Sequence, residues 1–321
     1  MKGSRSGASH DPVLIDEVIG SLQPRAGGQY VDGTFGAGGY SRAILEAADC
    51  KVWAIDRDPD VIRHAAEIVT EFEGRLTVIE GRFGDMRALL ADHGVGAVDG
   101  IALDLGVSSM QLDHGERGFS FRFDGPLDMR QSRDGRSAAD IVNETDESVL
   151  ADIIFKYGEE RQARRIARAI VAARSGVSLT RTAQLADIIR SVYRGGSKSK
   201  TDPATRTFQA IRIETNDELG ELERGLAASE ILLAPGGRLA VVSFHSLEDR
   251  IVKQFLRDRS GTGRSVSRHI PDTATDSAQN AFRLLRRGAI KPSKADTDRN
   301  PRARSARLRI AERLSSDGKG G

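Results

Sequence analysis

A glycine-rich segment near the start of the chain has the residue types that bind a nucleotide-containing cofactor. It runs Asp32-Gly33-Thr34-Phe35-Gly36-Ala37-Gly38-Gly39 and follows a short apolar run. Glycine lets a backbone approach a ligand closely because it has no Cβ. Asp56 ends the next apolar run, 23 residues after Gly33. A carboxylate in that place can accept hydrogen bonds from both hydroxyls of an adenosine ribose.

Two classes of cofactor fit this pattern, the nicotinamide dinucleotides and S-adenosylmethionine. The dinucleotide fingerprint Gly-x-Gly-x-x-Gly, counted from Gly36, fails at Ser41. Asp32 directly precedes the loop, where a carboxylate would repel a pyrophosphate but suits the ammonium of a methionine moiety. We therefore predict S-adenosylmethionine, with a nicotinamide oxidoreductase as the alternative. Asp32 also fits a structural role, in which its carboxylate accepts hydrogen bonds from backbone N–H groups of the loop.

Further candidate residues follow the later apolar runs. Phe83 follows the third run, where its ring or backbone could flank an adenine, or its ring could pack in the core. Asp104 and Gln111 lie in or just after the fourth run, where an acceptor would meet an activated methyl group. Asp104 is therefore a candidate catalytic residue, with a role as loop anchor as the alternative. His245 is a second candidate, as a general base, although a lone histidine more often has a structural role.

The apolar runs alternate with helix-like patterns, which is typical of a parallel sheet built from βαβ units. Strands are predicted at residues 29–32, 51–56, 76–79, 101–105 and 238–244, with late strands at 281–290 and 306–311. Helices are predicted at residues 40–48, 59–71, 85–93, 219–233 and 246–257, and a turn at 235–237. The predicted fold class is α/β, with an open, mostly parallel, Rossmann-like sheet as the core.

The alternating pattern stops near residue 113. Residues 113–135 are rich in Gly, Asp and Phe and predict a long ordered loop, and residues 145–213 predict helices, interrupted by a Gly/Ser/Lys stretch at 195–200. The sheet pattern then resumes. We therefore predict a methyltransferase core at residues 1–113 and 214–321, with an inserted loop and helical domain at residues 114–213.

The composition limits the classes of protein that fit. A single cysteine, Cys50, excludes an intramolecular disulfide and a cysteine-based metal cluster, and no His or Cys pair has metal-ligand spacing, so no metal is expected. No apolar run is long enough to cross a bilayer, and the polar residues 1–10 do not resemble a secretory signal. These features predict a cytoplasmic protein without membrane contact.

Charge is unevenly distributed along the chain. Residues 250–321 contain 18 Lys and Arg against 7 Asp and Glu, a local charge of +11, whereas the whole chain carries +2. Four arginines, Arg161, Arg164, Arg165 and Arg168, flank an apolar stripe in the predicted insertion. This asymmetry predicts a polyanionic partner, with a solvated tail as the alternative.

Several long motifs resemble the RsmH (MraW) family of bacterial rRNA methyltransferases. They include Asp104-Leu105-Gly106-Val107-Ser108-Ser109, Arg117-Gly118-Phe119-Ser120-Phe121 and Ser243-Phe244-His245-Ser246-Leu247-Glu248. Further matches lie at residues 10–14, 32–39, 54–59, 125–130, 158–161, 204–210 and 300–305. Together they extend along nearly the whole chain in family order. The chain therefore resembles the members of this family.

The resemblance implies both an activity and a site. The activity is transfer of a methyl group from S-adenosylmethionine to the N4 amino group of a cytidine in the decoding region (P site) of 16S rRNA of the small ribosomal subunit. The cofactor residues implied by motif are Gly38, Gly39, Tyr40, Asp56, Phe83, Asp104 and Gln111. Many members have His where this chain has Tyr40, so a contact made by an imidazole would be lost here. The sequence leaves the oligomeric state open, a homodimer included.

The group that receives the amine hydrogens is not settled by the motif. Many amino methyltransferases place a polar residue, two prolines and an aromatic residue after the fourth strand, whereas this chain has Asp104-Leu105-Gly106-Val107. Asp104, a loop carbonyl or the turn at residues 243–246 could serve. A third hypothesis is an RNA-binding assembly factor that keeps the fold without the chemistry, and the set Asp32, Gly38, Gly39 and Asp56 argues against it.

Overall fold

The computed structural model describes residues 12–193, 201–261 and 280–315. The chain divides into two compact units, one formed by residues 1–106 and 219–321 and the other by residues 107–218. The sequence-based boundaries at 113/114 and 213/214 differ from these divisions by seven residues (113 − 106) and five residues (218 − 213). The predicted segments 1–10 and 195–200 fall outside the described residues, as do residues 262–279.

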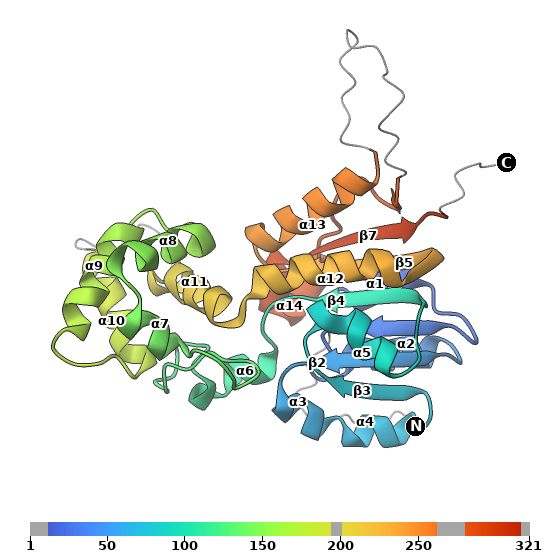
Figure 1. The fold of residues 1–321 in the computed structure, drawn as a ribbon, viewed down its shortest axis with the longest axis horizontal. Helices are drawn as coiled ribbons and strands as arrows, with labels where there is room; N and C mark the ends of the chain where they lie inside the picture. Colours follow the sequence, from blue (N-terminus) through green and yellow to red (C-terminus); the bar gives the residue numbers. More distant parts are fainter. Residues whose placement is uncertain (1–11, 194–200, 262–279, 316–321) are drawn as a thin grey trace, which may run out of the picture. The chain divides into compact units, whose positions relative to one another are not determined.

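In the described residues, the first unit contains one seven-stranded sheet, in the order β3-β2-β1-β4-β5-β7-β6 (Figure 1). Parallel pairs join β1 (Gln29–Asp32), β2 (Lys51–Asp56), β3 (Leu76–Glu80), β4 (Val98–Asp104) and β5 (Leu233–Ser243). Two strands at one edge pair in antiparallel fashion, β7 (Arg307–Arg313) with β5 and β6 (Phe282–Leu284) with β7. The predicted open, mostly parallel, Rossmann-like α/β sheet is confirmed.

The chain order reverses between β1 and β4. From β1 the sheet extends through β2 to β3 on one side, and from β4 through β5 on the other. In open α/β sheets, ligands bind beyond the carboxyl ends of the strands at such a reversal. A ligand site is therefore expected at the carboxyl ends of β1 and β4.

Helices precede, connect and follow these strands. They are α1 (Ile15–Leu22), α2 (Gly39–Ala47), α3 (Pro59–His64), α4 (Ala66–Glu71), α5 (Met86–Asp92), α12 (Glu218–Leu232), α13 (Ser246–Arg259) and α14 (Lys294–Arg299). Three of them, α5, α12 and α13, pack with the strands in one apolar cluster. The cluster combines Ile101 and Leu103 of β4 with Leu222 and Leu226 of α12 and Val252 of α13. Burying such aliphatic side chains is the main source of stability for the sheet and its helices.

Three predicted elements differ from the structure. The helix predicted at 59–71 is two helices, because Ala65 interrupts it between α3 and α4. The turn predicted at 235–237 lies inside β5, where the register shifts between Leu233 and Arg238 and Gly236 has φ +80°. The late strand predicted at 281–290 is only three residues long as β6, and Ile290 forms an isolated bridge with Leu308.

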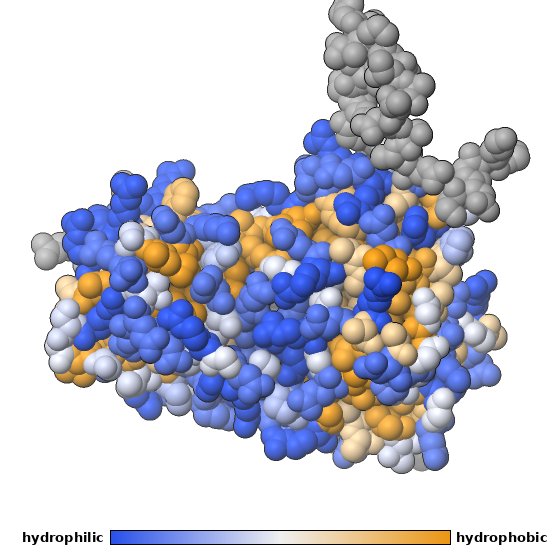
Figure 2. All heavy atoms as spheres, viewed as in Figure 1, coloured by the Kyte–Doolittle hydropathy of each residue, from blue (hydrophilic) through white to orange (hydrophobic). Residues whose placement is uncertain are grey.

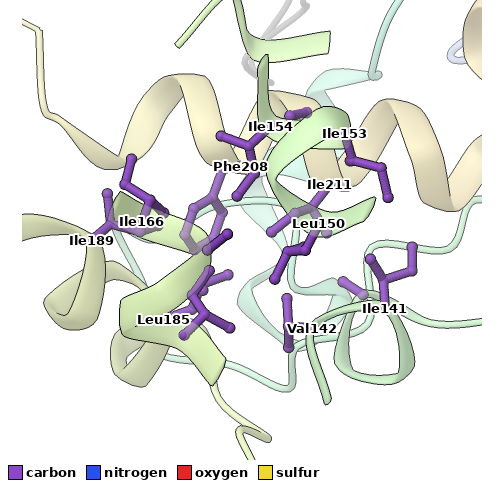
Figure 3. Packing of buried hydrophobic residues seen from close by; sticks show 14 of the residues in the cluster. Ile141, Val142, Leu150, Ile153, Ile154, Ile166, Leu185, Ile189, Phe208 and Ile211 are labelled. Carbon is purple, nitrogen blue, oxygen red and sulfur yellow. The ribbon is translucent and has the colours of Figure 1, made fainter. Parts of the chain in front are cut away.

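The second unit is helical and has its own core. It contains α6 (Ser109–Asp113), a short 3-10 turn η2 (Gly115–Arg117), α7 (Ala138–Glu144), α8 (Glu147–Gly158), α9 (Ala163–Arg174), α10 (Thr182–Val192) and α11 (Ala204–Asn216). Figure 3 shows apolar side chains from several helices meeting in this core, including Leu150, Ile166, Leu185 and Phe208. A separate core is what allows this insertion to fold as a unit.

Hydrophilic residues cover much of the face shown in Figure 2, with apolar residues visible between them. In the part of the chain that the structure describes, no helix is both long enough and apolar enough to cross a membrane. The large apolar side chains that are exposed include Phe123, Val149, Phe155, Val177 and Ile231.

Candidate functional site

The glycine-rich loop between β1 and α2 is hydrogen-bonded to both neighbouring strands. The N–H of Gly33 donates to the carbonyl of Ala102 on β4 at 2.9 Å, and the N–H of Phe35 donates to the carbonyl of Ile55 on β2 at 3.0 Å. The Thr34 hydroxyl oxygen accepts a hydrogen bond from the Asp104 N–H at 2.7 Å. The loop is therefore fixed to the carboxyl ends of β2 and β4, and Thr34 is a positioning residue that the sequence did not single out.

Gly38 and Gly39 end this loop, and both positions require glycine. Gly38 has φ +76°, and a Cβ there would lie 2.6 Å from Cδ1 of Ile68. A Cβ on Gly39 would lie 2.0 Å from Cγ of Pro12. The segment that begins at Pro12 therefore packs directly onto the backbone of the glycine loop.

The Tyr40 ring is buried, and its hydroxyl donates to the carbonyl of Val13. Burial and the nearby carboxyls of Asp104 and Asp32 raise the pKa of Tyr40 well above its usual value. The hydroxyl is thus protonated and holds the segment before α1 against α2. Whether the Tyr40 backbone also contacts a cofactor stays a prediction.

Asp32 is fully buried at the end of β1 and holds the loop together. Its Oδ2 accepts hydrogen bonds from the N–H and the hydroxyl of Ser41, at 3.0 and 2.7 Å, and its Oδ1 accepts from the Thr34 N–H at 3.3 Å. Burial raises the pKa of Asp32 to about 6, although these hydrogen bonds oppose the shift. Asp32 therefore has the structural role that the sequence left open. A cofactor contact by Asp32 remains a prediction.

Asp56 ends β2 and also contacts the loop. Its Oδ2 accepts from the Gly36 N–H at 2.8 Å, and its Oδ1 accepts from the Asp58 N–H at 2.9 Å. Burial raises the pKa of Asp56, and the two backbone donors oppose this effect. Each carboxylate oxygen can accept more than one hydrogen bond, so the arrangement leaves acceptor capacity for ribose hydroxyls.

Phe83 lies in the short 3-10 turn η1 (Phe83–Asp85) that follows β3. A Cβ on Gly225 of α12 would lie 2.5 Å from the Phe83 ring, and a Cβ on Gly33 would lie 3.2 Å from the Cβ of Phe83. The ring therefore packs on α12 and its Cβ lies beside the glycine loop. Phe83 therefore packs in the core, which is one of the two roles that the sequence left open. An adenine contact would come from the exposed part of the Phe83 ring or from its backbone.

A buried acid on α12 connects the turns that carry Asp56 and Phe83. Oε2 of Glu221 lies 2.7 Å from Nη1 of Arg57 and 3.3 Å from Nη1 of Arg82. Burial raises the pKa of Glu221, and the two guanidinium groups oppose this shift. The sequence analysis missed this group, because Glu221 and Arg57 are 164 positions apart and no local pattern relates them.

Asp104 ends β4 beside the loop. Its Oδ1 is buried and has no hydrogen-bond partner among the described residues. Burial, with the negative charges of Asp32 and Glu248, holds the pKa of Asp104 well above its usual range. A buried polar atom without a partner is costly and points to a group that completes the site.

His245 begins α13 as its N-cap residue. Its Nδ1 accepts from the Glu248 N–H at 3.4 Å, its Nε2 lies 3.2 Å from Oε1 of Glu248, and Oε2 of Glu248 accepts from the His245 N–H at 3.1 Å. These contacts form a capping box. The structural role is therefore present, and a general-base role for His245 stays a prediction.

Gln111 belongs to the second unit, on α6. Its Oε1 accepts from the Ser108 N–H at 3.1 Å, and its own N–H donates to the Ser108 hydroxyl at 3.2 Å. The side chain is largely buried. These contacts organise the segment that leaves β4, and the predicted cofactor contact of Gln111 is not tested by them.

Comparison with known proteins identifies the family. Residues 7–314 match the model of the MraW methylase family. The chain belongs to this family. It is 61% identical over 96% of its length, and 93% of the relative, to the "Ribosomal RNA small subunit methyltransferase H" of Rhodospirillum centenum. It is 58% identical to the protein of the same name from Rhodospirillum rubrum, over 95% of this chain and 94% of that one. The family that the motifs indicated is confirmed.

Solved structures resemble the chain more weakly. An rRNA methylase from Streptococcus thermophilus is 12% identical, with a TM-score of 0.37, 98% of this chain covered and 100% of that one. The N-methyltransferase NodS from Bradyrhizobium japonicum is 9% identical, with a TM-score of 0.41 and 94% of each chain covered. Membership of a methylase family, and not these likenesses, confirms S-adenosylmethionine as the cofactor class that the loop predicted.

Proposed function

We propose that this chain transfers a methyl group from S-adenosylmethionine to rRNA of the small ribosomal subunit, at the N4 amino group of a cytidine in the decoding region (P site) of 16S rRNA. The relatives that cover nearly the whole chain are named as small-subunit rRNA methyltransferases. The cytosine and its position come from the motif resemblance. The observation that carries the chemical part of the proposal is the unpartnered Asp104 carboxyl oxygen beside the glycine loop.

The residues present fit such a cofactor. Asp56 would accept hydrogen bonds from the ribose hydroxyls, and the backbone of Gly38 and Gly39 would lie along the ligand. The turn at Phe83 would border the adenine. Asp104 has a buried oxygen that needs a donor, and an ammonium or an amine supplies one. When bound, the cofactor supplies an activated methyl group, so the protein mainly has to align the acceptor and exclude water.

Ligand binding would change the protonation state of Asp104. In the structure its pKa is held well above its usual range by burial, Asp32 and Glu248. A positive charge placed nearby favours the ionised form and lowers the pKa of an acid. The Asp104 carboxylate would then accept hydrogens from the cytosine amine, whose lone pair is delocalised and needs orientation. In this way cofactor binding and activation of the acceptor would be linked through one residue.

Exposed arginines would bind the rRNA backbone. Arg161, Arg164 and Arg168 have exposed side chains in the helical unit, and Arg304 is exposed near β7. Arg309, which also lies in the basic region, forms a two-point ion pair with Asp249 at 2.8 and 3.1 Å. Arg309 therefore has a structural role, and the exposed arginines are the better candidates for phosphate contacts. The target cytidine must leave its base stack to reach the site.

The decisive experiment maps methylated nucleosides by mass spectrometry. Small subunits and protein-free 16S rRNA from cells lacking this protein are incubated with the purified protein and labelled S-adenosylmethionine. One new N4-methylcytidine in the decoding region is expected, and its presence on one substrate alone identifies the true acceptor. A methyl group on another base would refute the N4-cytidine assignment. Calorimetric binding of NAD in place of S-adenosylmethionine would favour the oxidoreductase alternative.

A further inference from the structure

Phe123 is an aromatic ring held at the surface of the helical unit. The residue is 56% exposed. Two positions earlier, Phe121 packs against the apolar core and meets Phe208 edge to face, with ring centroids 5.0 Å apart. The same short segment therefore anchors one ring in the core and presents another to solvent.

The turn that carries Phe123 is braced by a buried threonine. The Thr182 hydroxyl donates to the Phe123 carbonyl at 3.0 Å and accepts from the Gly125 N–H at 3.0 Å. The Thr182 N–H donates to the Gly125 carbonyl at 2.9 Å. Between these contacts, Nε of Arg181 donates to Oδ2 of Asp124 at 2.8 Å. These hydrogen bonds fix the backbone from Phe123 to Gly125, and therefore the point from which the Phe123 ring projects.

A close backbone approach supports the turn from its other side. A Cβ on Gly125 would lie 1.9 Å from the carbonyl oxygen of Gly115, so only glycine fits there. A Cβ on Gly115 would lie 3.0 Å from the Cβ of Phe123. The position of Phe123 is thus defined by contacts on both sides, and little conformational entropy would be lost when a ligand stacks on it.

The charged residues next to Phe123 in the chain, together with Arg181, which pairs with Asp124, favour an anion. Arg122 and Arg181 are exposed, and Asp124 offsets one of them through its ion pair. These three groups sum to one positive charge, 2 − 1 = +1. An aromatic face with an adjacent arginine matches one nucleotide of a single strand, because the base stacks on the ring and the phosphate binds the guanidinium.

We propose that Phe123 and Arg122 form a stacking platform for one unpaired nucleotide of the RNA substrate, with its base on the Phe123 ring and its phosphate at Arg122. This inference rests on the proposed function and adds a second contact for the RNA, apart from the cytidine that is methylated. A protein partner is the less favoured occupant, because an exposed ring between two charged residues, Arg122 and Asp124, differs from the contiguous apolar patches that mark many protein-binding surfaces.

The test measures affinity of the full-length protein for protein-free 16S rRNA at several salt concentrations, with S-adenosylhomocysteine present. Phe123→Ala is expected to weaken binding about tenfold without changing the salt dependence, because stacking releases no counterions. Phe123→Leu should weaken it similarly, since leucine has no aromatic face, whereas Phe123→Trp should retain the wild-type affinity. Arg122→Gln should lower the slope of log affinity against log salt by about one.

Phe155→Ala is the matched control, because Phe155 on α8 is 64% exposed and should not alter RNA affinity. Unchanged affinity in Phe123→Ala would overturn the proposal. Full affinity in Phe123→Leu would also overturn it, as would a loss seen only with intact subunits, since these results indicate an apolar contact with protein. Failure of the proposed function is distinguishable, because wild-type protein would then methylate neither rRNA nor subunits.

Discussion

Oε2 of Glu221 lies 2.7 Å from Nη1 of Arg57, and the two side chains are only 2% and 10% exposed. Arg57 follows Asp56 directly, and Glu221 also contacts Arg82, which precedes Phe83. One carboxylate on α12 therefore connects the turns after β2 and β3. Because these turns carry both predicted adenosine contacts, their relative position depends on a residue distant in the sequence.

Glu221→Gln is expected to lower both stability and cofactor affinity. Removing one partner of a buried ion pair costs about 3–5 kcal/mol, and the loosened turns would bind S-adenosylmethionine less tightly. Urea unfolding and calorimetric titration measure the two effects. Glu71→Gln is the control, because Glu71 pairs with Arg42 at an exposed position and should leave both quantities nearly unchanged. Wild-type stability in Glu221→Gln would show that this pair contributes nothing.

Asp56→Ala should weaken S-adenosylmethionine binding at least tenfold. Each lost charge-assisted hydrogen bond to a ribose hydroxyl is worth about 1.5–3 kcal/mol, and 1.4 kcal/mol corresponds to a factor of ten. The variant also loses the acceptors of the Gly36 and Asp58 N–H groups, so its fold is checked by circular dichroism. Asp60→Ala, in the same segment, should bind normally. A folded Asp56→Ala protein with wild-type affinity would remove Asp56 from the site.

Asp104→Asn is expected to fold and to transfer methyl groups far more slowly than the wild type. The amide keeps the shape of the side chain but cannot become an anion when the site fills. If Asp104 only positions the cofactor, the loss lies in cofactor affinity. If it serves the amine, the loss persists at saturating cofactor in single-turnover measurements on small subunits. Full single-turnover activity would exclude both roles and direct attention to the Ser243 to Ser246 turn.

The stability of the protein should depend on pH through Asp32. The unfolded chain releases this proton near pH 3.8, whereas the folded protein releases it at about 6. Between these values the unfolded state binds fewer protons, so this group makes stability fall as pH rises. The gap corresponds to about 3 kcal/mol. The unfolding free energy of the wild type should therefore fall from pH 4 to pH 6 through Asp32, whereas that of Asp32→Asn should lack this fall. Parallel pH profiles in urea unfolding would contradict the assignment.

Arg164→Gln should weaken rRNA binding and flatten its salt dependence, because binding with one phosphate contact fewer releases fewer counterions. Cofactor affinity should not change. Arg309→Gln is the contrasting variant, since Arg309 binds Asp249. It should lower stability and leave the salt slope intact. Filter binding measured from about 50 to about 300 mM salt compares the two variants. Identical slopes in wild type and Arg164→Gln would rule out a phosphate contact at this arginine.

Local patterns were sufficient to predict the first two strands. β1 and β2 have the bounds expected for them, because each is a short apolar run that ends at an aspartate, Asp32 or Asp56. The glycine loop was recognisable because Gly38 and Gly39 must avoid Cβ clashes that any other residue would make. Strand bounds and glycine-rich turns depend on residues that are neighbours in the sequence, so the sequence alone can predict them.

Other features depend on contacts that no local pattern records. The loop segment from Pro12 meets Gly39, and the Tyr40 hydroxyl binds the Val13 carbonyl, although nothing in these motifs specifies that pairing. The hydrogen bond from the Gly36 N–H to the Asp56 carboxylate joins residues 20 positions apart and follows from no local pattern. Likewise, the split between α3 and α4 at Ala65 has no glycine or proline to predict it.

The insertion between β4 and β5 has a consequence for how the chain is made. Leu103 on β4 pairs with Val241 on β5, 138 positions later (241 − 103). At the usual rate of synthesis this separation corresponds to a delay on the order of ten seconds. During that time β4 is an unpaired strand edge, which is a template for aggregation. The helical unit, whose core is complete in itself, can fold in this interval, so we expect released chains that end just before β5 to protect residues 138–193 and 204–216 from protease while β4 stays sensitive.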